Sequence, residues 1–326
     1  MVGKPDHSGP FPGDGSEGSI GQAVQRSEAR KALRAESRGW PMRIDTERGR
    51  TIGTNGVMFF RGRSRIDGAP IVGIMTGTKT RSSNPKTGDM LQTWILRSDM
   101  HPVEALATGQ DASICGDCPY RPHGDPLPGK RYGRRLCYVN PMGPASVYRT
   151  LIAGKYAEAD TRELCALVEG RRVRMGSYGD PVAIPRTSWG WIDSAAGRTG
   201  YTHRWRHLDR LEPTRWGRNL VADWWRSRIM ASVDSEEERR TAAAAGWRTF
   251  RPLFQGEERS RSEIQCPAAP ESGARTTCAD CRLCSGSMSD RSRPIPSIAI
   301  DIHGAGAGNV KAPRPAWVPI TIGGAS

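Results

Sequence analysis

Residues 172–185, RVRMGSYGDPVAIP, decide the fold that we expect for this chain. The first six residues predict a β-strand, and Tyr178 begins a tight turn of four residues. Gly176 and Gly179 allow the backbone to approach a ligand closely, and Pro181 holds Asp180 at the mouth of the sheet. The Asp180 carboxylate is suited to bind an amino group, to act as a base or to attack as a nucleophile. Alternatively, it caps the following helix, with Pro181 in the first turn.

Strands and helices alternate along most of the chain. Apolar patterns predict strands at 57–60, 70–75, 91–96, 172–177, 198–203, 228–233, 247–253 and 297–302, and helices at 102–108, 146–169, 187–196, 220–225 and 236–245. Such alternation is typical of parallel βαβ units with right-handed crossovers. We therefore expect an α/β core.

Polar residues follow several of these predicted strands, as Asp180 does. They are His203, Asp234, and Asp301 with His303. Because (β/α) barrels carry their chemistry at the carboxyl ends of the strands, we predict a complete or partial (β/α) barrel rather than a doubly wound sheet. His203 is either a base or metal ligand, or a packed, hydrogen-bonded histidine. Asp234 either takes part in the chemistry or caps the helix that follows it.

Length and composition limit the number of domains that the chain can form. The 326 residues include 38 Gly and 24 Pro and allow one large domain or two small ones. We expect a disordered arm at 1–38, a barrel-like catalytic core at 39–265, a four-cysteine metal module with the last strand at 266–303, and a flexible tail at 304–326. The chain has no run of 18 apolar residues and no apolar segment at its start. We therefore expect no membrane partner and a cytoplasmic location, where thiols stay reduced.

Four of the eight cysteines lie close together near the end of the chain, with the spacing C-x11-C-x2-C-x2-C. We call Cys266, Cys278, Cys281 and Cys284 the C-terminal cysteine cluster. Two successive C-x2-C steps turn several sulfur atoms toward one centre, and the upstream cysteine completes a tetrahedral set. The spacing predicts a metal site and leaves open whether it holds Zn²⁺ or an iron–sulfur cluster.

A second group, which we call the N-terminal cysteine cluster, consists of Cys115, Cys118 and Cys137. It lies in a loop rich in Pro, Gly and Arg. Three thiolates leave one coordination position, which either His123 fills in a structural zinc site or a small molecule occupies in a catalytic one. Cys165 occupies an apolar position of a predicted helix and is interpreted as a buried small hydrophobe.

The charge favours a polyanionic partner. The chain has 48 Lys and Arg against 34 Asp and Glu, which gives a net charge of +14. Lys and Arg that neutralise phosphates bind nucleic acid without regard to its sequence. Arginines and tryptophans interleave after residue 201, and the candidate contacts are Arg204, Trp205, Arg206, Arg215, Trp216 and Arg218. The alternative is an amphipathic helix with Trp in the core and Arg in water.

The order of these motifs resembles a group of uncharacterised bacteriophage proteins, which are similar to the radical SAM superfamily. The motifs are Cys115, Cys118 and Cys137-Tyr138, then Ser177-Tyr178-Gly179-Asp180-Pro181, Gly200-Tyr201-Thr202-His203, and the C-terminal cysteine cluster. The resemblance implies a [4Fe–4S] cluster with an open iron on the N-terminal cysteine cluster. It also implies S-adenosylmethionine bound at the Tyr178–Asp180 turn, a pocket lined by His203, and an auxiliary cluster on the C-terminal cysteines.

A more distant resemblance is to the barrel of tRNA-guanine transglycosylases and their phage DNA-modifying relatives. It implies Asp180 or Asp234 as nucleophile in base exchange, with a structural zinc on the C-terminal cysteines. The leading expectation is a phage-type iron–sulfur enzyme that modifies nucleic acid, either DNA or RNA. The alternatives are this transglycosylase and a non-catalytic, zinc-stapled nucleic-acid-binding protein.

Overall fold

The computed structural model describes residues 54–82, 84–209, 219–269, 273, 276–286 and 295–303. The chain divides into two units, Met1–Arg48 and Gly49–Ser326. Every described residue belongs to the second unit. The arm expected at 1–38 and the tail expected at 304–326 lie outside the described residues.

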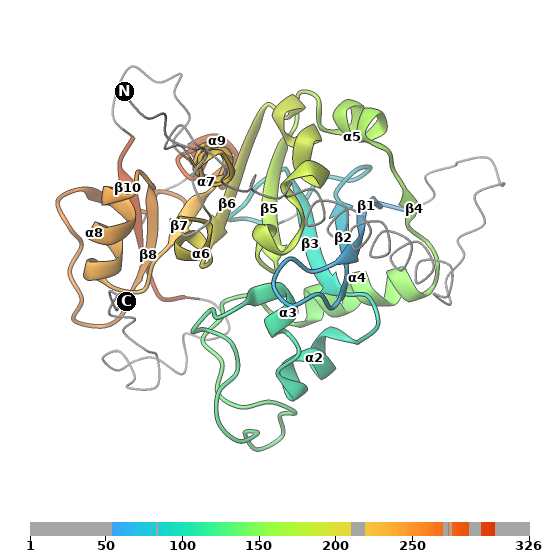
Figure 1. The fold of residues 1–326 in the computed structure, drawn as a ribbon, viewed down its shortest axis with the longest axis horizontal. Coiled ribbons are helices and arrows are strands. Elements are labelled where there is room, and N and C mark those ends of the chain that lie inside the picture. The colour runs from blue at the N-terminus through green and yellow to red at the C-terminus, as the bar shows by residue number, and fades with distance from the viewer. Residues whose placement is uncertain are drawn as a thin grey trace, which may run out of the picture. The chain divides into compact units, whose positions relative to one another are not determined.

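A ten-stranded sheet forms the centre of the second unit (Figure 1). Its strands are β1 (Gly56–Arg63), β2 (Pro70–Thr76), β3 (Met90–Arg97), β4 (Ala157–Glu158), β5 (Arg172–Tyr178), β6 (Gly197–Thr202), β7 (Met230–Ser232), β8 (Thr249–Leu253), β9 (Glu263–Gln265) and β10 (Ser297–Asp301). They lie in the order β4-β1-β2-β3-β5-β6-β7-β8-β10-β9. The expected α/β class is therefore confirmed.

The sheet consists of an antiparallel part and a parallel part. β1, β2 and β3 pair antiparallel. From β3 onward each pair is parallel, through β5, β6, β7, β8 and β10 to β9. The parallel strands follow one another in sequence order as far as β10, without the reversal that defines a doubly wound sheet. The described strands do not close into a barrel, because β4 and β9 form two separate edges.

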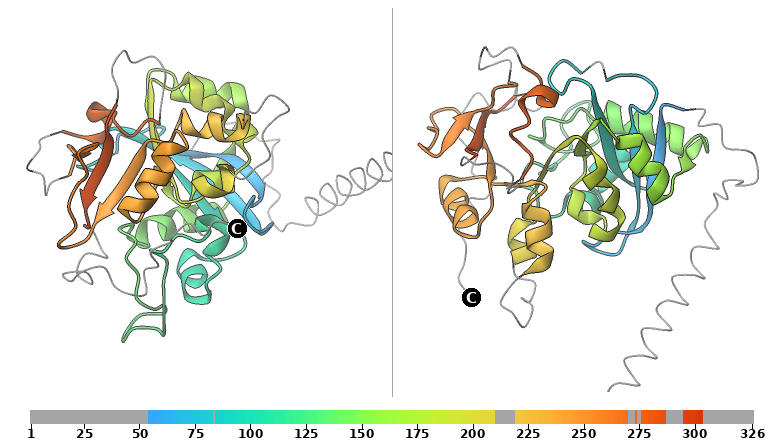
Figure 2. Two further views of the ribbon diagram at one scale, coloured as in Figure 1. Left: turned by 60° about the vertical axis from the view of Figure 1, so that its left-hand side comes forward. Right: turned by 90° about the horizontal axis from the view of Figure 1, so that it is seen from above.

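Helices flank the sheet and connect its strands (Figures 1 and 2). They are α2 (Pro102–Thr108), α3 (Ala112–Cys115), α4 (Met142–Ile152), α5 (Thr161–Val168), α6 (Trp205–Asp209), α7 (Leu220–Arg226), α8 (Glu236–Ala244) and α9 (Cys278–Cys281), with 3₁₀ turns η1 (Pro181–Ala183) and η2 (Arg186–Ser194). α4 packs against β3, α8 against β8, and α5 against η2. None of the helices in the described residues is long and apolar enough to cross a membrane.

Two helix predictions were wrong. The helix expected at 146–169 is broken into α4, the short strand β4, and α5. Gly154 takes a φ of 66°, and Asp160 starts α5 with a capping box to Glu163, so the chain turns between two helices with separate apolar faces. The helix expected at 187–196 is the 3₁₀ segment η2, with Trp189 and Trp191 fully buried.

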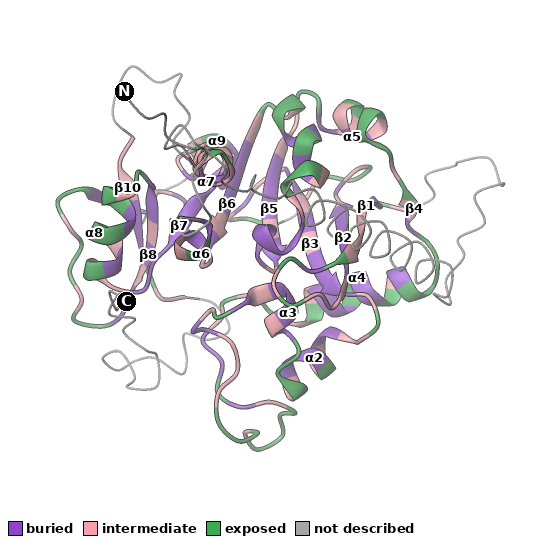
Figure 3. Cartoon of the chain, viewed as in Figure 1, coloured by how far each residue is buried: buried purple, intermediate pink, exposed green. Residues whose placement is uncertain are grey.

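The buried residues concentrate on the strands (Figure 3). β2 and β3 are almost wholly buried, and α2, α3 and α4 contact β3. β10 pairs with β8, so the region expected as a separate module at 266–303 contributes a strand to the same sheet as the expected core. The cysteine-rich segments are therefore joined to the same sheet that positions the other candidate residues.

Candidate functional site

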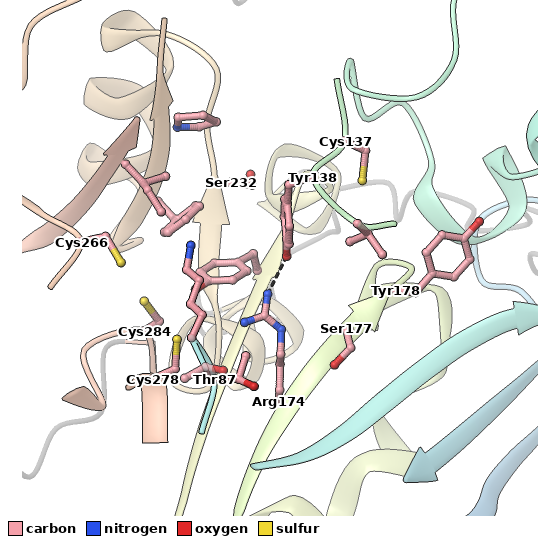
Figure 4. A pocket seen from close by; sticks show the side chains of 18 of the residues that line it. Thr87, Cys137, Tyr138, Arg174, Ser177, Tyr178, Ser232, Cys266, Cys278 and Cys284 are labelled. Atoms are coloured by element: carbon pink, nitrogen blue, oxygen red, sulfur yellow. Dashed lines mark hydrogen bonds between the residues drawn. The ribbon is translucent and has the colours of Figure 1, made fainter. Parts of the chain in front are cut away.

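A cavity of about 620 Å³ lies where the parallel strands end. Residues at or just after the ends of β5, β6, β7 and β10 line it: Asp180, His203, Ser232 and Asp301 with His303. Seven of the eight cysteines also line it, namely Cys115, Cys118, Cys137, Cys266, Cys278, Cys281 and Cys284. Both cysteine clusters thus face one space, which the sequence did not predict (Figure 4).

The N-terminal cysteine cluster is fixed by the loop that follows β3. Cys115 ends α3, and the Cys118 amide donates to the Cys115 carbonyl at 3.3 Å. Arg121 holds this turn through an ion pair with the buried Asp111 at 2.8 Å and a hydrogen bond to the Gly116 carbonyl at 3.0 Å. Burial, followed by neighbouring negative charge, raises the pKa of the Cys115 thiol well above its usual value. This thiol therefore stays protonated unless a bound cation stabilises its thiolate.

His203 connects the N-terminal cysteine cluster to the end of β7. Its Nε2 lies 4.0 Å from Cys118 Sγ and 3.4 Å from Asp234 Oδ1. Burial alone would lower the pKa of His203, but the negative charges of Cys118 and Asp234 raise it well above its usual value. Asp234 is not the N-cap of α8. Ser235 is the N-cap, and its side chain accepts a hydrogen bond from the Glu238 amide. The capping alternative for Asp234 was therefore wrong.

Asp180 is held by three donors. The amide of Val182 donates to Oδ1 at 3.0 Å, and the Thr202 hydroxyl and His203 amide donate to Oδ2 at 2.9 and 3.0 Å. Burial raises the pKa of this carboxyl group, and the donors oppose the rise. Asp180 thus caps η1 and ties the ends of β5 and β6 together, as the capping alternative proposed, while it also lines the cavity.

The two glycines of the β5 turn serve chain packing. Both take positive φ, 70° at Gly176 and 82° at Gly179. A Cβ at Gly176 would lie 2.6 Å from the Gly179 carbonyl oxygen, and one at Gly179 would lie 2.8 Å from Ile95 Cβ. Protein atoms thus occupy both Cβ positions, which explains why glycine is needed there, and both glycines also line the cavity, where a ligand can approach their backbone.

The hydroxyl of Tyr178 is buried and has no hydrogen-bond partner among the described residues. Tyr178 lines the cavity, and burial raises its pKa well above the usual value, with Cys115 the next cause. A buried hydroxyl without a partner is costly. Its place beside the N-terminal cysteine cluster leaves one donor available to a group held by those cysteines.

The C-terminal cysteine cluster lies in apolar surroundings. Cys266, Cys278 and Cys284 pack with Met90, Met230, Ile298 and Ile300. Figure 4 shows their three sulfur atoms turned toward one another. Backbone hydrogen bonds fix two of them: the Cys266 amide donates to Ala299 and the Cys278 amide to Lys86, both at 2.8 Å. Burial raises the pKa of Cys284 to about 12, although a hydrogen bond with Tyr201 lowers it.

Arg174 lies between the two clusters (Figure 4). Its Nη2 donates to the hydroxyl of Tyr138 at 2.5 Å, and the rings of Tyr138 and Tyr201 lie 6.0 and 5.9 Å from its guanidinium carbon. Burial alone would lower its pKa, but the tyrosines and Cys278 raise it, so the group stays charged. Sequence reasoning missed Arg174 and the ring of Tyr138, although both lie beside residues that it singled out.

The expected metal ligands are only partly brought together. His123 does not line the cavity, and its Nε2 lies 2.8 Å from the Pro119 carbonyl oxygen. His203 takes the place beside Cys118 that was expected for His123. Across the described part of the chain, no three His, Cys, Asp or Glu side chains converge closely enough to hold a metal ion.

In the described part of the expected nucleic-acid surface the tryptophan is buried and the two arginines are half-buried and paired with carboxylates. Trp205 is buried at 2% exposure, and Arg206 lies over its ring and pairs with the buried Glu238 at 2.9 Å. Arg204 lies 3.6 Å from Asp117. The stacking role expected for Trp205 is therefore wrong, because its ring is part of the core. The other three candidates, Arg215, Trp216 and Arg218, lie outside the described residues.

No family model, curated protein or solved structure matches this chain.

Proposed function

We propose that this protein is an iron–sulfur enzyme of the radical SAM type that modifies nucleic acid. The observation that carries the proposal is the convergence of both cysteine clusters on one cavity, which also reaches the carboxyl ends of the parallel strands β5, β6, β7 and β10. A zinc ion that only staples a fold needs no ligand-sized cavity, and its coordination is closed. Two thiol clusters on a common cavity suit a reaction carried out between them.

The donor set fits such centres. Soft thiolates favour zinc or iron–sulfur clusters over hard cations. Burial and neighbouring negative charge raise the pKa of the Cys115 thiol, and a bound metal would supply the positive charge that favours its thiolate and displaces the proton. The buried Tyr178 hydroxyl supports the same interpretation, because hydrogen bonds to cluster sulfur tune iron–sulfur centres. Each centre requires its thiols to come closer together than they lie here.

The N-terminal cysteine cluster would hold the reactive [4Fe–4S] cluster. With three thiolates it would supply single electrons and an open iron position for S-adenosylmethionine. We place that cofactor against the Tyr178–Asp180 turn, with the amino group toward the Asp180 side. The sequential parallel strands β3, β5, β6, β7, β8 and β10 support this assignment as an open, partial version of the barrel.

His203 and Asp234 would handle protons beside that centre. Asp234 Oδ1 lies 3.4 Å from Nε2 of His203, an arrangement that orients the ring and favours its protonated form. The protonated ring holds a proton at the cavity wall. It is therefore placed to donate to a substrate atom, and Asp234 is a positioning residue.

The C-terminal cysteine cluster would hold an auxiliary cluster. Four thiolates complete the coordination of a [4Fe–4S] cluster or of Zn²⁺, and the apolar lining excludes water from it. The net charge of +14 supports a nucleic acid as the partner.

The alternatives have less support. A transglycosylase mechanism needs a carboxylate that is free to attack, whereas Asp180 already accepts three hydrogen bonds. A purely binding protein needs exposed aromatic side chains, whereas Trp205 is buried. Neither alternative explains why both cysteine clusters line the same cavity.

The test is cleavage of S-adenosylmethionine by anaerobically purified full-length chain with dithionite as electron donor. We expect 5′-deoxyadenosine and methionine from the wild type, none from Cys137→Ala, and wild-type amounts from Cys165→Ala. Cys165 is the matched control because it lies in α5 and does not line the cavity. Equal product from Cys137→Ala and the wild type would contradict the proposal, as would a wild type that carries iron and makes no product.

A further inference from the structure

The charge on Arg174 has no counterpart among the described residues. Arg174 is 7% exposed, yet no carboxylate in the described ranges pairs with it. By contrast, the buried Arg251 pairs with Glu263 at 2.6 Å, and Arg121 pairs with Asp111. A buried charge is normally paired, because desolvation of an isolated ion costs several kcal/mol. Arg248, which is also buried, donates to three backbone carbonyl groups. Arg174 differs from these arginines because its one hydrogen-bond partner among the described residues is the Tyr138 hydroxyl.

The guanidinium also has unused donors. In the described residues Nη2 is the one nitrogen with a hydrogen-bond partner, the Tyr138 hydroxyl. Tyr138 takes one of the two Nη2 hydrogen atoms, so the second Nη2–H and the N–H groups of Nη1 and Nε are left for a ligand, and Arg174 lines the cavity. The second Nη2–H and the parallel N–H of its neighbouring nitrogen form a planar fork that matches the oxygen spacing of a phosphate or carboxylate.

The remaining charges of the cavity favour a dianion. Lys86 and Arg282 line it together with Arg174, whereas its acidic lining residues are Asp180 and Asp301. Asp180 accepts from three donors and Asp301 from Gln265 at 3.0 Å, so both carboxylates are engaged with protein groups. Three cationic side chains on one cavity suit a phosphate group better than a singly charged carboxylate.

Aromatic rings lie close to the same guanidinium. Tyr201 and Phe250 pack at 4.2 Å between ring centroids, and both line the cavity. Aromatic side chains bind nucleobases by stacking. The volume of about 620 Å³ is within the range of small-molecule sites and accommodates one nucleotide.

We propose that Arg174, oriented by Tyr138, binds a phosphate group of a nucleotide between the two cysteine clusters and so determines substrate specificity. This assignment rests on the proposed function for its choice of substrate class. It also implies that a nucleotide of a polymer must leave its stack to enter the cavity. A free nucleotide would enter directly.

The test is calorimetric titration of the full-length, metal-loaded chain with thymidine 5′-monophosphate, with thymidine, and with a ten-residue oligothymidylate. We expect thymidine 5′-monophosphate to bind more tightly than thymidine. Arg174→Lys, which keeps the charge and loses the fork, should weaken binding of the monophosphate by about 10- to 100-fold. Arg172→Gln is the control, because Arg172 lies on the same strand and does not line the cavity.

The competing interpretation is that Arg174 only neutralises thiolates of the C-terminal cysteine cluster, since Cys278 contributes to its raised pKa. That interpretation predicts that Arg174→Gln loses metal, and that Arg174→Lys keeps both metal and wild-type affinity. Unchanged affinity in Arg174→Lys overturns our assignment, and so does equal binding of thymidine and its monophosphate. Binding of the oligomer identifies a polymer substrate, and binding of the monophosphate alone identifies a free nucleotide; either result supports the subsite.

Failure of this inference is distinguishable from failure of the proposed function. Cleavage of S-adenosylmethionine depends on the N-terminal cysteine cluster and not on the fork of Arg174. Cleavage by a chain that shows no Arg174-dependent phosphate binding would remove the subsite and leave the proposed function in place. Phosphate binding by a chain that cleaves no S-adenosylmethionine would support the subsite and contradict the proposed function.

Discussion

The two cysteine clusters line the same cavity in different surroundings. The N-terminal cluster has a histidine and a carboxylate beside it, with His203 Nε2 4.0 Å from Cys118 Sγ and 3.4 Å from Asp234 Oδ1. Three cysteines of the C-terminal cluster pack in a larger apolar group with Met90, Met230 and Ile298. The first cluster therefore has neighbours that can exchange protons, whereas the second contributes more to apolar packing.

From this difference we infer that the N-terminal cluster takes part in the reaction, and that the C-terminal cluster mainly stabilises the fold. A metal centre beside a protonatable histidine and an open cavity can take part in a reaction, while one inside an apolar group is held rigidly and kept dry. We therefore expect substitutions in the N-terminal cluster to act on activity, and those around the C-terminal cluster to act first on stability. The following predictions test that division, in order of expected effect.

Cys115→Ala should abolish activity with little unfolding. The loss of one of three ligands removes the reactive centre, so we expect a fall in turnover of at least about 1,000-fold. Circular dichroism should show a folded chain with a melting temperature near that of Cys165→Ala. A Cys115→Ala protein that turns over at the wild-type rate would contradict the assignment of the reaction to the N-terminal cluster.

Met90→Ala should destabilise the chain through the C-terminal cluster. Met90 is 1% exposed and begins β3 within the apolar group around Cys278 and Cys284. Truncation of a buried Met costs about 2–5 kcal/mol in the free energy of unfolding, measured by urea denaturation. Iron at the N-terminal cluster should be retained in the folded variant. A cost below about 0.5 kcal/mol, typical of surface positions, would show that this packing contributes nothing.

Cys284 should react slowly with iodoacetamide after chelation of metal under reducing conditions. At pH 8 a thiol with a pKa of about 12 is ionised to about 1 part in 10⁴. Because the rarer thiolate is also more nucleophilic, we expect alkylation about 100-fold slower than that of free cysteine. Mass spectrometry of the labelled peptides measures this rate, with the half-buried Cys118 as internal comparison. Labelling of Cys284 as fast as Cys118 would contradict the apolar surroundings assigned to it.

Asp180→Asn should have the smallest effect. Asn caps helices as well as Asp does, so the hydrogen bond from the Val182 amide is retained. One of the two bonds at Oδ2, from Thr202 or His203, is weakened, and we expect a loss of about 1 kcal/mol in stability. Asp180→Ala removes all three and should cost more. Activity that is abolished in a stable Asp180→Asn protein, and that excess S-adenosylmethionine does not restore, would instead show that the carboxylate reacts.

Local patterns predicted most strands and several helices. α2 matches its predicted bounds, because Pro102 and the following apolar residues are unambiguous in the sequence. Of the polar residues expected at strand ends, Asp180, His203, Asp301 and His303 line one cavity. Asp234 does not line it and lies behind His203, at 3.4 Å. The break between α4 and α5 was missed because their apolar positions continue one helical period across Gly154. The antiparallel pairing of β1 to β3 was missed because strand direction depends on distant partners.

The relation between the two cysteine clusters could not be predicted. Spacing identified each set of cysteines, but their common cavity depends on β10 joining the sheet beside β8, far along the chain from the first set. The same is true of Arg174. Its neighbours in the sequence predict a strand, but they do not indicate that its side chain lines a cavity. The buried Trp205 shows the converse, because Trp beside Arg is as typical of a core edge as of a nucleic-acid surface.

The most direct test of two centres on one cavity is the iron and acid-labile sulfide content of the full-length chain purified without oxygen. We predict about eight iron and about eight sulfide per chain, as for two [4Fe–4S] clusters, with a broad absorbance band. Zinc alone in a colourless protein would contradict the account.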